Sequence, residues 1–249
     1  MIVVVGDGLV WTEGRSAEAA NAGTGNADQA DGRAAGRATE IASAAVQTGA
    51  SVQLVSKVGD DPTGDAIVLS LGRQGIGHVA ILRDAASSSL VKAPAESNEI
   101  EDLAPEAELS AALNDDDPAG VGAGAASAPV TPVRTLGPKL EPADLELALR
   151  YLSSFGVIVT ATPLPEAALA VIAEAAAYNG AQLVVVSEGG EAKASIEGAT
   201  VLQAPADDPD HRFAKLVGRY AAGLDGGLDP ATAFVSASEA LGWEAASPA

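Results

Sequence analysis

Few side chains in this sequence stand in patterns that catalysis would use, and the clearest group surrounds His211. Asp208 and Asp210 lie within three residues of this histidine, and Asp207 lies one residue beyond Asp208. An imidazole beside carboxylates can act as a general base or form one corner of a metal site. No second histidine lies near it in the sequence. A solvated acidic loop is therefore the alternative interpretation.

Three other groups could bind ions or ligands. Glu188 and Glu191 enclose two glycines after a predicted strand, where α/β sheets bind ligands, although an ordinary turn is the favoured interpretation. The three aspartates of 115–117 could chelate a hard cation weakly or form a solvated charge cluster. The glycine-rich run 120–125 lacks the aspartate and the helix that should follow an anion-binding loop, so we interpret it as linker.

The chain carries a strong negative charge. It has 34 acidic and 14 basic residues, which gives a formal charge of −20 over 249 residues. Such a surface repels phosphate backbones and anionic headgroups, so binding to nucleic acid or to membranes is disfavoured. The excess of acid serves solubility or, alternatively, a salt-adapted cytoplasm. Because there is no cysteine, disulfides, thiolate nucleophiles and cysteine-based metal sites are excluded.

The opening apolar run indicates a buried strand and no leader. Residues 2–6 are too few for a signal peptide, lack a basic leader, and end in a Gly-Asp turn. No window of the sequence reaches the length of a membrane span. We therefore expect a cytoplasmic protein.

Strands and helices alternate along most of the chain. Strands are predicted at 1–7, 51–56, 156–160, 183–187 and 201–202, and helices at 37–48, 66–73, 141–152, 163–178, 212–224 and 229–241. This alternation implies right-handed βαβ units and a mostly parallel sheet with helices on both faces. The predicted fold is a three-layer α/β/α sandwich. Aromatic residues make up only 3% of the chain, so its core must consist of Val, Leu, Ile and Ala.

Two stretches interrupt the alternation. Residues 12–36 contain almost no large apolar side chain, and residues 84–138 are rich in Ala, Gly, Ser, Asp and Pro. Such compositions cannot bury enough surface to become ordered. We predict low-complexity loops there, within a single domain that spans 1–249. A short acidic helix at 103–113 stays open.

The passage 50–82 resembles one particular family. Gly59-Asp60-Asp61 follows a strand, and Gly64 and Gly75 mark the beginning and the end of a helix. This run is similar to the ribokinase or PfkB family of sugar and nucleoside kinases, which carries a GA-strand-GxVGDDxFG-helix-GV run at this point. The resemblance implies a ribokinase-like fold and ATP-dependent phosphoryl transfer, with Mg²⁺, to a hydroxyl of a sugar or nucleoside.

The resemblance also implies sugar-binding positions after the first strand. The family's GDxNxD motif corresponds to residues 6–11, in which Asp7 remains as a candidate substrate-binding residue. Leu9 and Trp11 occupy the positions whose side chains hold sugar hydroxyls. A site that must bond hydroxyl groups loses discrimination when its polar side chains become apolar.

A second implied position opens the first helix. The family's GGKGANQA motif corresponds to residues 35–42, where one glycine of the pair, Gly36, remains and Glu40 replaces an asparagine. Gly36 and Arg37 are therefore candidate substrate-binding residues that form a residual ligand cradle at a helix N-terminus. An ordinary junction between loop and helix is the alternative.

The family's catalytic motif, DTxGAGD, does not occur in the sequence. Its glycines expose backbone N–H groups to the transferring phosphate, and its aspartate takes the proton from the hydroxyl. In the alignment, residues 208–210 replace Gly-Ala-Gly and His211 stands at the base, so we assign no catalytic residue. Neither low-complexity stretch shows the alternating pattern of lid strands, and the lid is predicted to be reduced or absent.

The resemblance leaves two explanations for the missing nucleotide site. Residues 201–206 match the family segment that precedes the nucleotide site. They nearly adjoin the helix predicted at 212–224, which matches the family helix that follows the catalytic motif. The strands between them are deleted or have diverged, and a deletion would leave an uncovered sheet edge near Val201 and Leu202. The implied protein is a kinase homologue with impaired catalysis; the alternative is a non-catalytic small-molecule-binding or assembly module.

Overall fold

The computed structural model describes most of the chain outside the two low-complexity stretches. The described residues are 1–13, 32–92, 137–152, 154–188, 196, 198–206, 208 and 210–242. All of them lie in one structural unit, bounded by Met1–Pro94 and Thr135–Ala249. A single domain over the whole chain stays a prediction, because residues 95–134 lie outside the described part. The possible helix at 103–113 lies outside it too.

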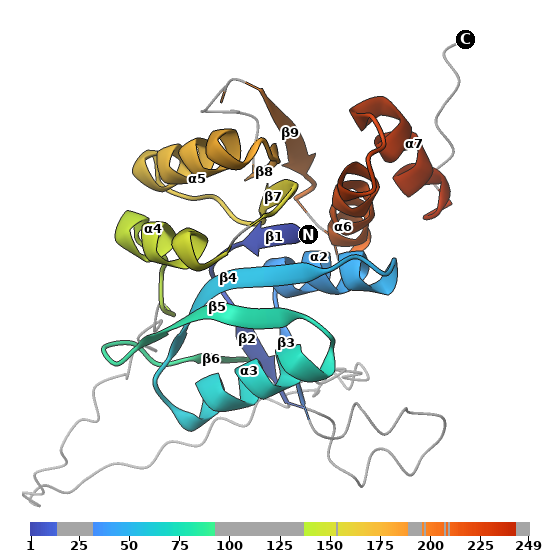
Figure 1. Cartoon of the computed structure of the whole chain (residues 1–249). Coiled ribbons are helices and arrows are strands. Elements are labelled where there is room, and N and C mark those ends of the chain that lie inside the picture. Colours follow the sequence, from blue (N-terminus) through green and yellow to red (C-terminus); the bar gives the residue numbers. More distant parts are fainter. Residues whose placement is uncertain are drawn as a thin grey trace, which may run out of the picture. The chain divides into compact units, whose positions relative to one another are not determined.

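Six parallel strands form the main sheet (Figure 1). In order across the sheet they are β5 (Gly77–Asp84), β4 (Val52–Gly59), β1 (Ile2–Val5), β7 (Val157–Thr160), β8 (Gln182–Glu188) and β9 (Ala199–Ala204). Every residue of β1 and β7 is buried. This burial is expected of central parallel strands, because helices cover both of their faces.

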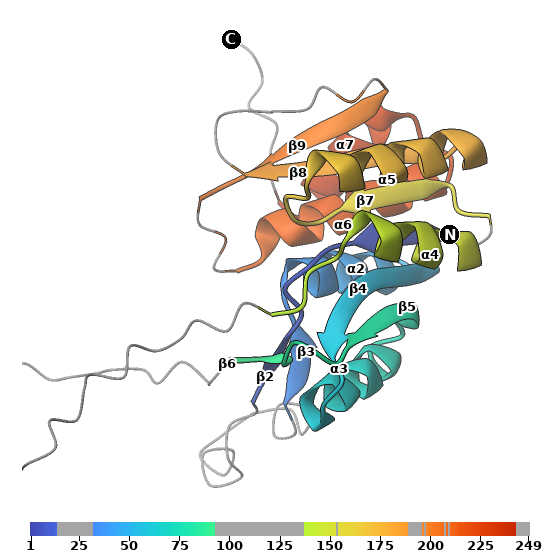
Figure 2. The same ribbon diagram turned by 90° about the vertical axis from the view of Figure 1, so that its left-hand side faces the viewer.

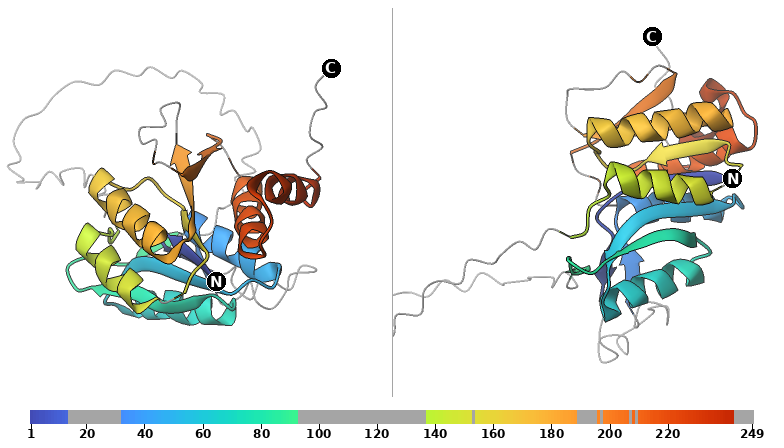
Figure 3. Two further views of the ribbon diagram at one scale, coloured as in Figure 1. Left: turned by 45° about the horizontal axis from the view of Figure 1, so that its top comes forward. Right: turned by 60° about the vertical axis from the view of Figure 1, so that its left-hand side comes forward.

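Helices lie on both faces of this sheet (Figure 2). One face carries α4 (Pro142–Tyr151) and α5 (Glu166–Asn179). The other carries α2 (Arg37–Gln47), α3 (Pro62–Arg73), α6 (Arg212–Asp225) and α7 (Pro230–Glu239), which packs on α6. Both views of Figure 3 show the sheet between the red helices α6 and α7 and the helices α4 and α5. The predicted three-layer α/β/α sandwich is confirmed.

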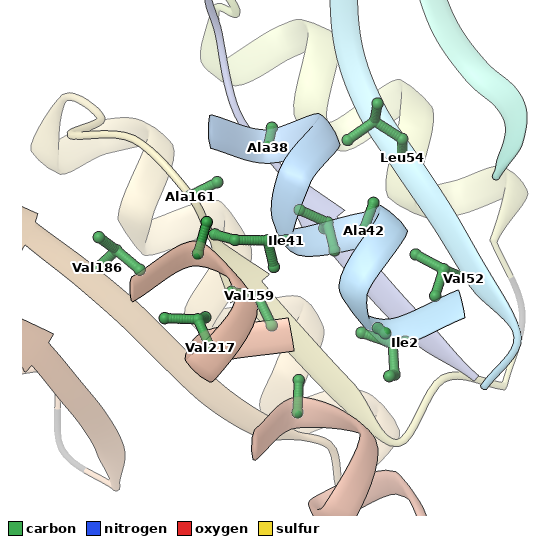
Figure 4. Packing of buried hydrophobic residues seen from close by; sticks show 14 of the residues in the cluster. Ile2, Ala38, Ile41, Ala42, Val52, Leu54, Val159, Ala161, Val186 and Val217 are labelled. Atoms are coloured by element: carbon green, nitrogen blue, oxygen red, sulfur yellow. The ribbon is translucent and has the colours of Figure 1, made fainter. Parts of the chain in front are cut away.

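The core on the α2 side consists mostly of small and branched aliphatic side chains, as the composition predicted (Figure 4), and two aromatic side chains, Phe213 and Tyr220, are buried among them. Ala38, Ile41 and Ala42 of α2 belong to the same buried cluster as Val159 of β7, and all four are fully buried. Helix α6 crosses α2 so closely that a Cβ on Gly218 would lie 2.4 Å from the carbonyl oxygen of Ile41. Small residues therefore fix the distance between these helices.

A second, smaller sheet joins three short strands in the order β3-β2-β6. They are β2 (Val10–Thr12), β3 (Arg33–Ala35) and β6 (Leu90–Lys92). The buried N–H of Ala34 donates to Ser70 Oγ of α3 at 2.9 Å, which fixes this sheet to the first half of the fold. The reduced or absent lid stays a prediction, because most of residues 12–36 and 84–138 lies outside the described part of the chain.

Residues 33–35 and 90–92 are therefore strands inside ranges that the sequence predicted as loops. Three residues are too few to show an alternating pattern, and the partners of each strand lie far away in sequence. Tertiary pairing, and not local propensity, decides their structure. The remainder of the two ranges lies largely outside the described residues.

Candidate functional site

The strand order has a switch point between β1 and β7. From β1 the chain proceeds outward through β4 to β5, and it then returns to β7 on the other side of β1. Ligands of open α/β sheets bind beyond the carboxyl ends of the strands at such a point. Gly6 lies there, and a Cβ on it would come within 3.0 Å of Ala38 Cβ and 3.2 Å of Ala161 Cβ. The ends of β1 and β7 and the start of α2 thus lie in close contact at the candidate site.

Asp7 follows β1 at this switch point. Its backbone N–H donates to Thr162 Oγ1 at 3.1 Å, and its carboxylate accepts the N–H of Leu140 at 2.8 Å. Burial raises the pKa of Asp7, although the Leu140 N–H and the nearby charge of Lys139 oppose the shift. Asp7 is thus a partly desolvated acid in which Oδ1 already accepts one hydrogen bond.

Gly36 precedes α2 and has a backbone conformation that favours glycine. Its φ is 118°, and a Cβ would lie 2.7 Å from the carbonyl oxygen of Gly8. The glycine therefore lets the connection between β1 and β2 pass directly over the start of the helix. No side chain caps this helix start. The remaining glycine of the motif thus has a structural role in addition to any ligand contact.

Arg37 is the first residue of α2, and its guanidinium bonds the carboxylate of Glu188 at the end of β8. The structure therefore brings together two groups that the sequence singled out separately. An anionic ligand would have to displace the Glu188 carboxylate from this arginine. The described residues show no hydrogen bond or ion pair between Arg37 and Asp7. Residues 189–191, the remainder of the predicted glycine turn, lie outside the described part.

The positions where hydroxyl-binding side chains were expected are apolar or already paired. Leu9 is 4% exposed and belongs to the core, and Trp11 packs against that core from β2. Glu40 is buried and forms an ion pair with Arg33 at 3.0 Å. Leu9, Trp11 and Glu40 therefore take part in packing and pairing of the protein itself.

Helix α6 begins at the carboxyl end of the sheet with its first turn already capped. His211 precedes the helix in a left-handed conformation, with φ 52° and ψ 30°. The carboxylate of Asp208 accepts the N–H groups of Phe213 at 3.1 Å and Ala214 at 3.3 Å. A carboxylate at this end also interacts favourably with the helix dipole. Asp208 thus does from outside the helix what a capping side chain does.

The sequence interpretation treated Asp208 as part of a solvated loop and missed this cap. An aspartate shortly before a predicted helix is a recognised start signal and could have identified it. No group of three His, Asp or Glu side chains that could hold a metal is found in the described residues. Asp207, 115–117 and 120–125 lie outside them. None of the helices in the described part is long and apolar enough to cross a bilayer.

Comparison with known proteins identifies the fold. No family model matches the sequence, and no curated protein is similar to it. A protein assigned as a phosphofructokinase of Staphylococcus aureus is 14% identical, with a TM-score of 0.55 over 98% of this chain and 92% of that chain. A protein assigned as ribokinase II of E. coli, in its apo form, is 13% identical, with a TM-score of 0.52 over 94% and 90%. The protein therefore has the ribokinase-like fold of PfkB sugar kinases.

Proposed function

We propose that this chain is a sugar kinase homologue in which phosphoryl transfer is impaired. The observation that carries the proposal is the cap on α6, where Asp208 accepts the N–H groups of Phe213 and Ala214. By the resemblance, this helix start is the position at which the GAGD glycines offer N–H groups to the transferring phosphate. A phosphate entering here would lose those donors and meet a negative charge.

ATP and Mg²⁺ are the substrate and the metal that the fold implies. The start of α6 does not fit the phosphates, because a carboxylate already occupies its donors, so no reaction step follows from them here. By the same resemblance, the position of the catalytic base carries His211, an exposed residue, in place of a carboxylate. Two parts of the transfer machinery are thus altered at the same helix start.

What remains at the switch point supports binding of an uncharged polyol as the second candidate function. Asp7 retains a second carboxylate oxygen, and Gly36 leaves the start of α2 without a side-chain cap. Because Glu188 neutralises Arg37, this end of the crevice favours a sugar or nucleoside over a phosphorylated ligand. The chain would then act as a cytoplasmic, non-catalytic binding or assembly module on the same scaffold.

A phosphoryl-transfer assay tests the first proposal. The full chain is incubated with Mg²⁺ and ATP and a panel of pentoses, hexoses and nucleosides, and ADP release is followed. We expect no turnover above the protein-free background. A variant in which Asp208→Gly, Pro209→Ala, Asp210→Gly and His211→Asp restore the family motif tests for gained turnover, with Asp210→Gly alone as the control. Turnover by the unmodified chain overturns the proposal.

Calorimetry separates the two candidates. We expect no binding of ATP, because the donors of α6 are occupied. If a sugar or nucleoside binds, Arg37→Ala and Asp7→Asn should each weaken it several-fold, whereas the exposed Lys215→Ala should not. Tight binding of ATP contradicts the closed helix start. Sugar affinity that is insensitive to both crevice variants contradicts the binding module.

A further inference from the structure

A cavity of about 310 Å³ lies between α6 and α7, at the end of α2 (Figure 1). Its walls come largely from small residues of α6 and α7 and of the turns that end them, among them Ala222, Gly223, Gly226, Ala233, Ala237 and Ala240. A Cβ on Gly223 would lie 3.0 Å from Ala233 Cβ, so the two helices approach closely beside the cavity. The volume lies at the lower end of the range of small-molecule sites.

One charged side chain lines this cavity, the partly buried Arg219 of α6. It forms no hydrogen bond or ion pair within the described part of the chain. The other described basic side chains that lack such a bond are all exposed, namely Arg73, Lys92, Lys139 and Arg150. The sequence has 34 acidic residues against 14 basic ones, so acidic partners are abundant. A partly buried arginine without a counter-charge is therefore unusual in this protein.

The end of α6 does not account for this arginine. Basic side chains complement the helix dipole in the last turn, and the last turn of α6 contains none, because Arg219 lies before it. The carbonyl oxygens of residues 222–224 already accept the backbone N–H groups of residues 226–228. The guanidinium is therefore not needed to cap the helix, and its N–H donors stay available to a ligand.

We propose that this cavity binds a small monocarboxylate with an apolar body, held by the guanidinium of Arg219. The planar guanidinium matches a carboxylate with two parallel hydrogen bonds. Ser236 also lines the cavity, and its hydroxyl forms no hydrogen bond within the described part of the chain, so it can donate a further bond. Leu228 and the alanines of the walls suit a short hydrocarbon group.

Charge favours a monocarboxylate over a phosphate group. The cavity offers one positive charge within a chain of formal charge −20, so the second negative charge of a phosphate would find no partner. The site is also separate from the crevice at the switch point. Thr48, at the end of α2, lines the cavity, whereas Arg37 begins this helix of about 16 Å. The inference goes beyond the proposed function and depends on neither candidate.

Nuclear magnetic resonance tests the binding and its place. The full chain, labelled with ¹⁵N, is titrated with hexanoate and with benzoate at neutral pH and constant ionic strength. We expect dissociation constants on the order of 1 mM, with the largest amide shifts at Gly226 and Ser236 and none at Gly36 or Arg37. 1-Hexanol lacks the charge and inorganic phosphate lacks the apolar body, so each should bind about tenfold more weakly. Shifts centred on the crevice overturn the proposal, and so does the absence of saturable binding of both acids up to about 50 mM. Equal affinity for hexanol or phosphate overturns the ligand class.

Variants identify the group that holds the carboxylate. Arg219→Gln should weaken hexanoate binding about tenfold, Arg219→Lys should weaken it less, and Ser236→Ala should weaken it about threefold. Arg73→Gln is the matched control, because Arg73 is an exposed arginine without a partner that lies outside the cavity, and it should change nothing. Arg219→Gln should not lower the melting temperature without ligand, because no bond within the protein is lost. Unchanged affinity in Arg219→Gln overturns the proposal. A marked loss of stability in that variant overturns it too, since it would show that the guanidinium already has a partner.

Discussion

The two halves of the main sheet are specified in different ways. In the first half, β5-β4-β1, the turn after β4 is held by specific hydrogen bonds and by a close backbone contact. Asp61 accepts the N–H groups of Gly64 and Ser89, each at 2.7 Å, and so joins the start of α3 to the loop before β6. A Cβ on Gly64 would lie 2.3 Å from the carbonyl oxygen of Gly59. Only particular residue types fit such a turn.

The second half, β7-β8-β9, depends mainly on apolar burial. Its strands pair in regular register, and β9 ends the described sheet with an uncharged edge. The best-defined polar feature there is the Asp208 cap on α6. Burial of aliphatic surface tolerates many sequences, whereas a tight turn does not. The difference explains why a recognisable motif stands in the first half, whereas the second half can vary more in sequence and still fold.

The largest effect is expected from a substitution that disrupts the turn of the first half. Gly64→Ala places a methyl group against the backbone of Gly59, and we expect a loss of about 3 kcal/mol in the free energy of unfolding. In Gly72→Ala, on the same helix, the new methyl group meets only the side chain of His78. We expect the free energy of unfolding to stay unchanged or to rise by at most about 1 kcal/mol, because alanine favours the helix more than glycine does. Urea unfolding measures both. Equal effects would contradict the special role of the turn.

The next prediction concerns the contact that joins the halves. Gly218→Ala in α6 pushes a methyl group toward the carbonyl oxygen of Ile41 in α2, and a loss of about 2 kcal/mol is expected. The exposed Lys215→Ala on the same helix serves as the control and should remain within about 0.5 kcal/mol. Thermal melting of the two variants provides the measurement. A silent Gly218→Ala would mean that α6 moves freely away from α2.

The two aspartate caps can be compared directly. Asp61→Ala removes two backbone hydrogen bonds and should cost about 1–2 kcal/mol, and Asp208→Ala, with longer bonds, about 1 kcal/mol. The hydrogen bond from the Ser89 N–H is the main reason that the pKa of Asp61 is lowered. Its contribution is therefore complete above the ordinary value of 3.8 and disappears as the pH falls from there toward the lowered value.

Denaturation of both cap variants at neutral and at acid pH checks this difference. The cost of Asp61→Ala should shrink on acidification below the ordinary carboxyl range. An Asp208→Ala variant that is more destabilised than Asp61→Ala would reverse our ranking of the two halves.

The smallest effect is expected at the switch point. Burial raises the pKa of Asp7, so the folded state holds the proton more tightly than the unfolded chain does. Stability from this group is therefore lost as the pH rises from 3.8 through the raised value. Asp7→Asn keeps an oxygen that can accept the Leu140 N–H and removes the charge. We expect a small gain in melting temperature at neutral pH that vanishes below pH 3.8. A loss at neutral pH would show that the carboxylate is stabilising.

The sequence predicted most of the fold because long periodic segments and their start and stop residues act locally. Helix α2 is predicted from 37 to 48 and ends at Gln47, and β7 is predicted from 156 to 160 and covers Val157–Thr160. Helix α3 begins at Pro62, four residues before the predicted start, because Asp61 caps it. The small sheet was missed because its pairings are long-range.

The site was only partly predictable. Arg37 and Glu188 lie 151 residues apart in the sequence and were assigned to separate motifs. Only the order of the parallel strands brings them together. Gly36 was predicted to bind a ligand, whereas the close approach of the Gly8 backbone already explains why a glycine stands at this position. The ligand roles of Asp7, Gly36 and Arg37 stay predictions for the binding experiments above.

The alanine-rich interior has a consequence for how this protein tolerates random mutation. Ala38, Ala42, Ala45, Ala161 and Ala221 have no accessible surface. Every substitution of alanine except that to glycine adds volume, and an interior without spare room cannot absorb it. Genetic drift should therefore damage this protein more often by crowding than by cavities, and compensating changes should be reductions in size at facing positions.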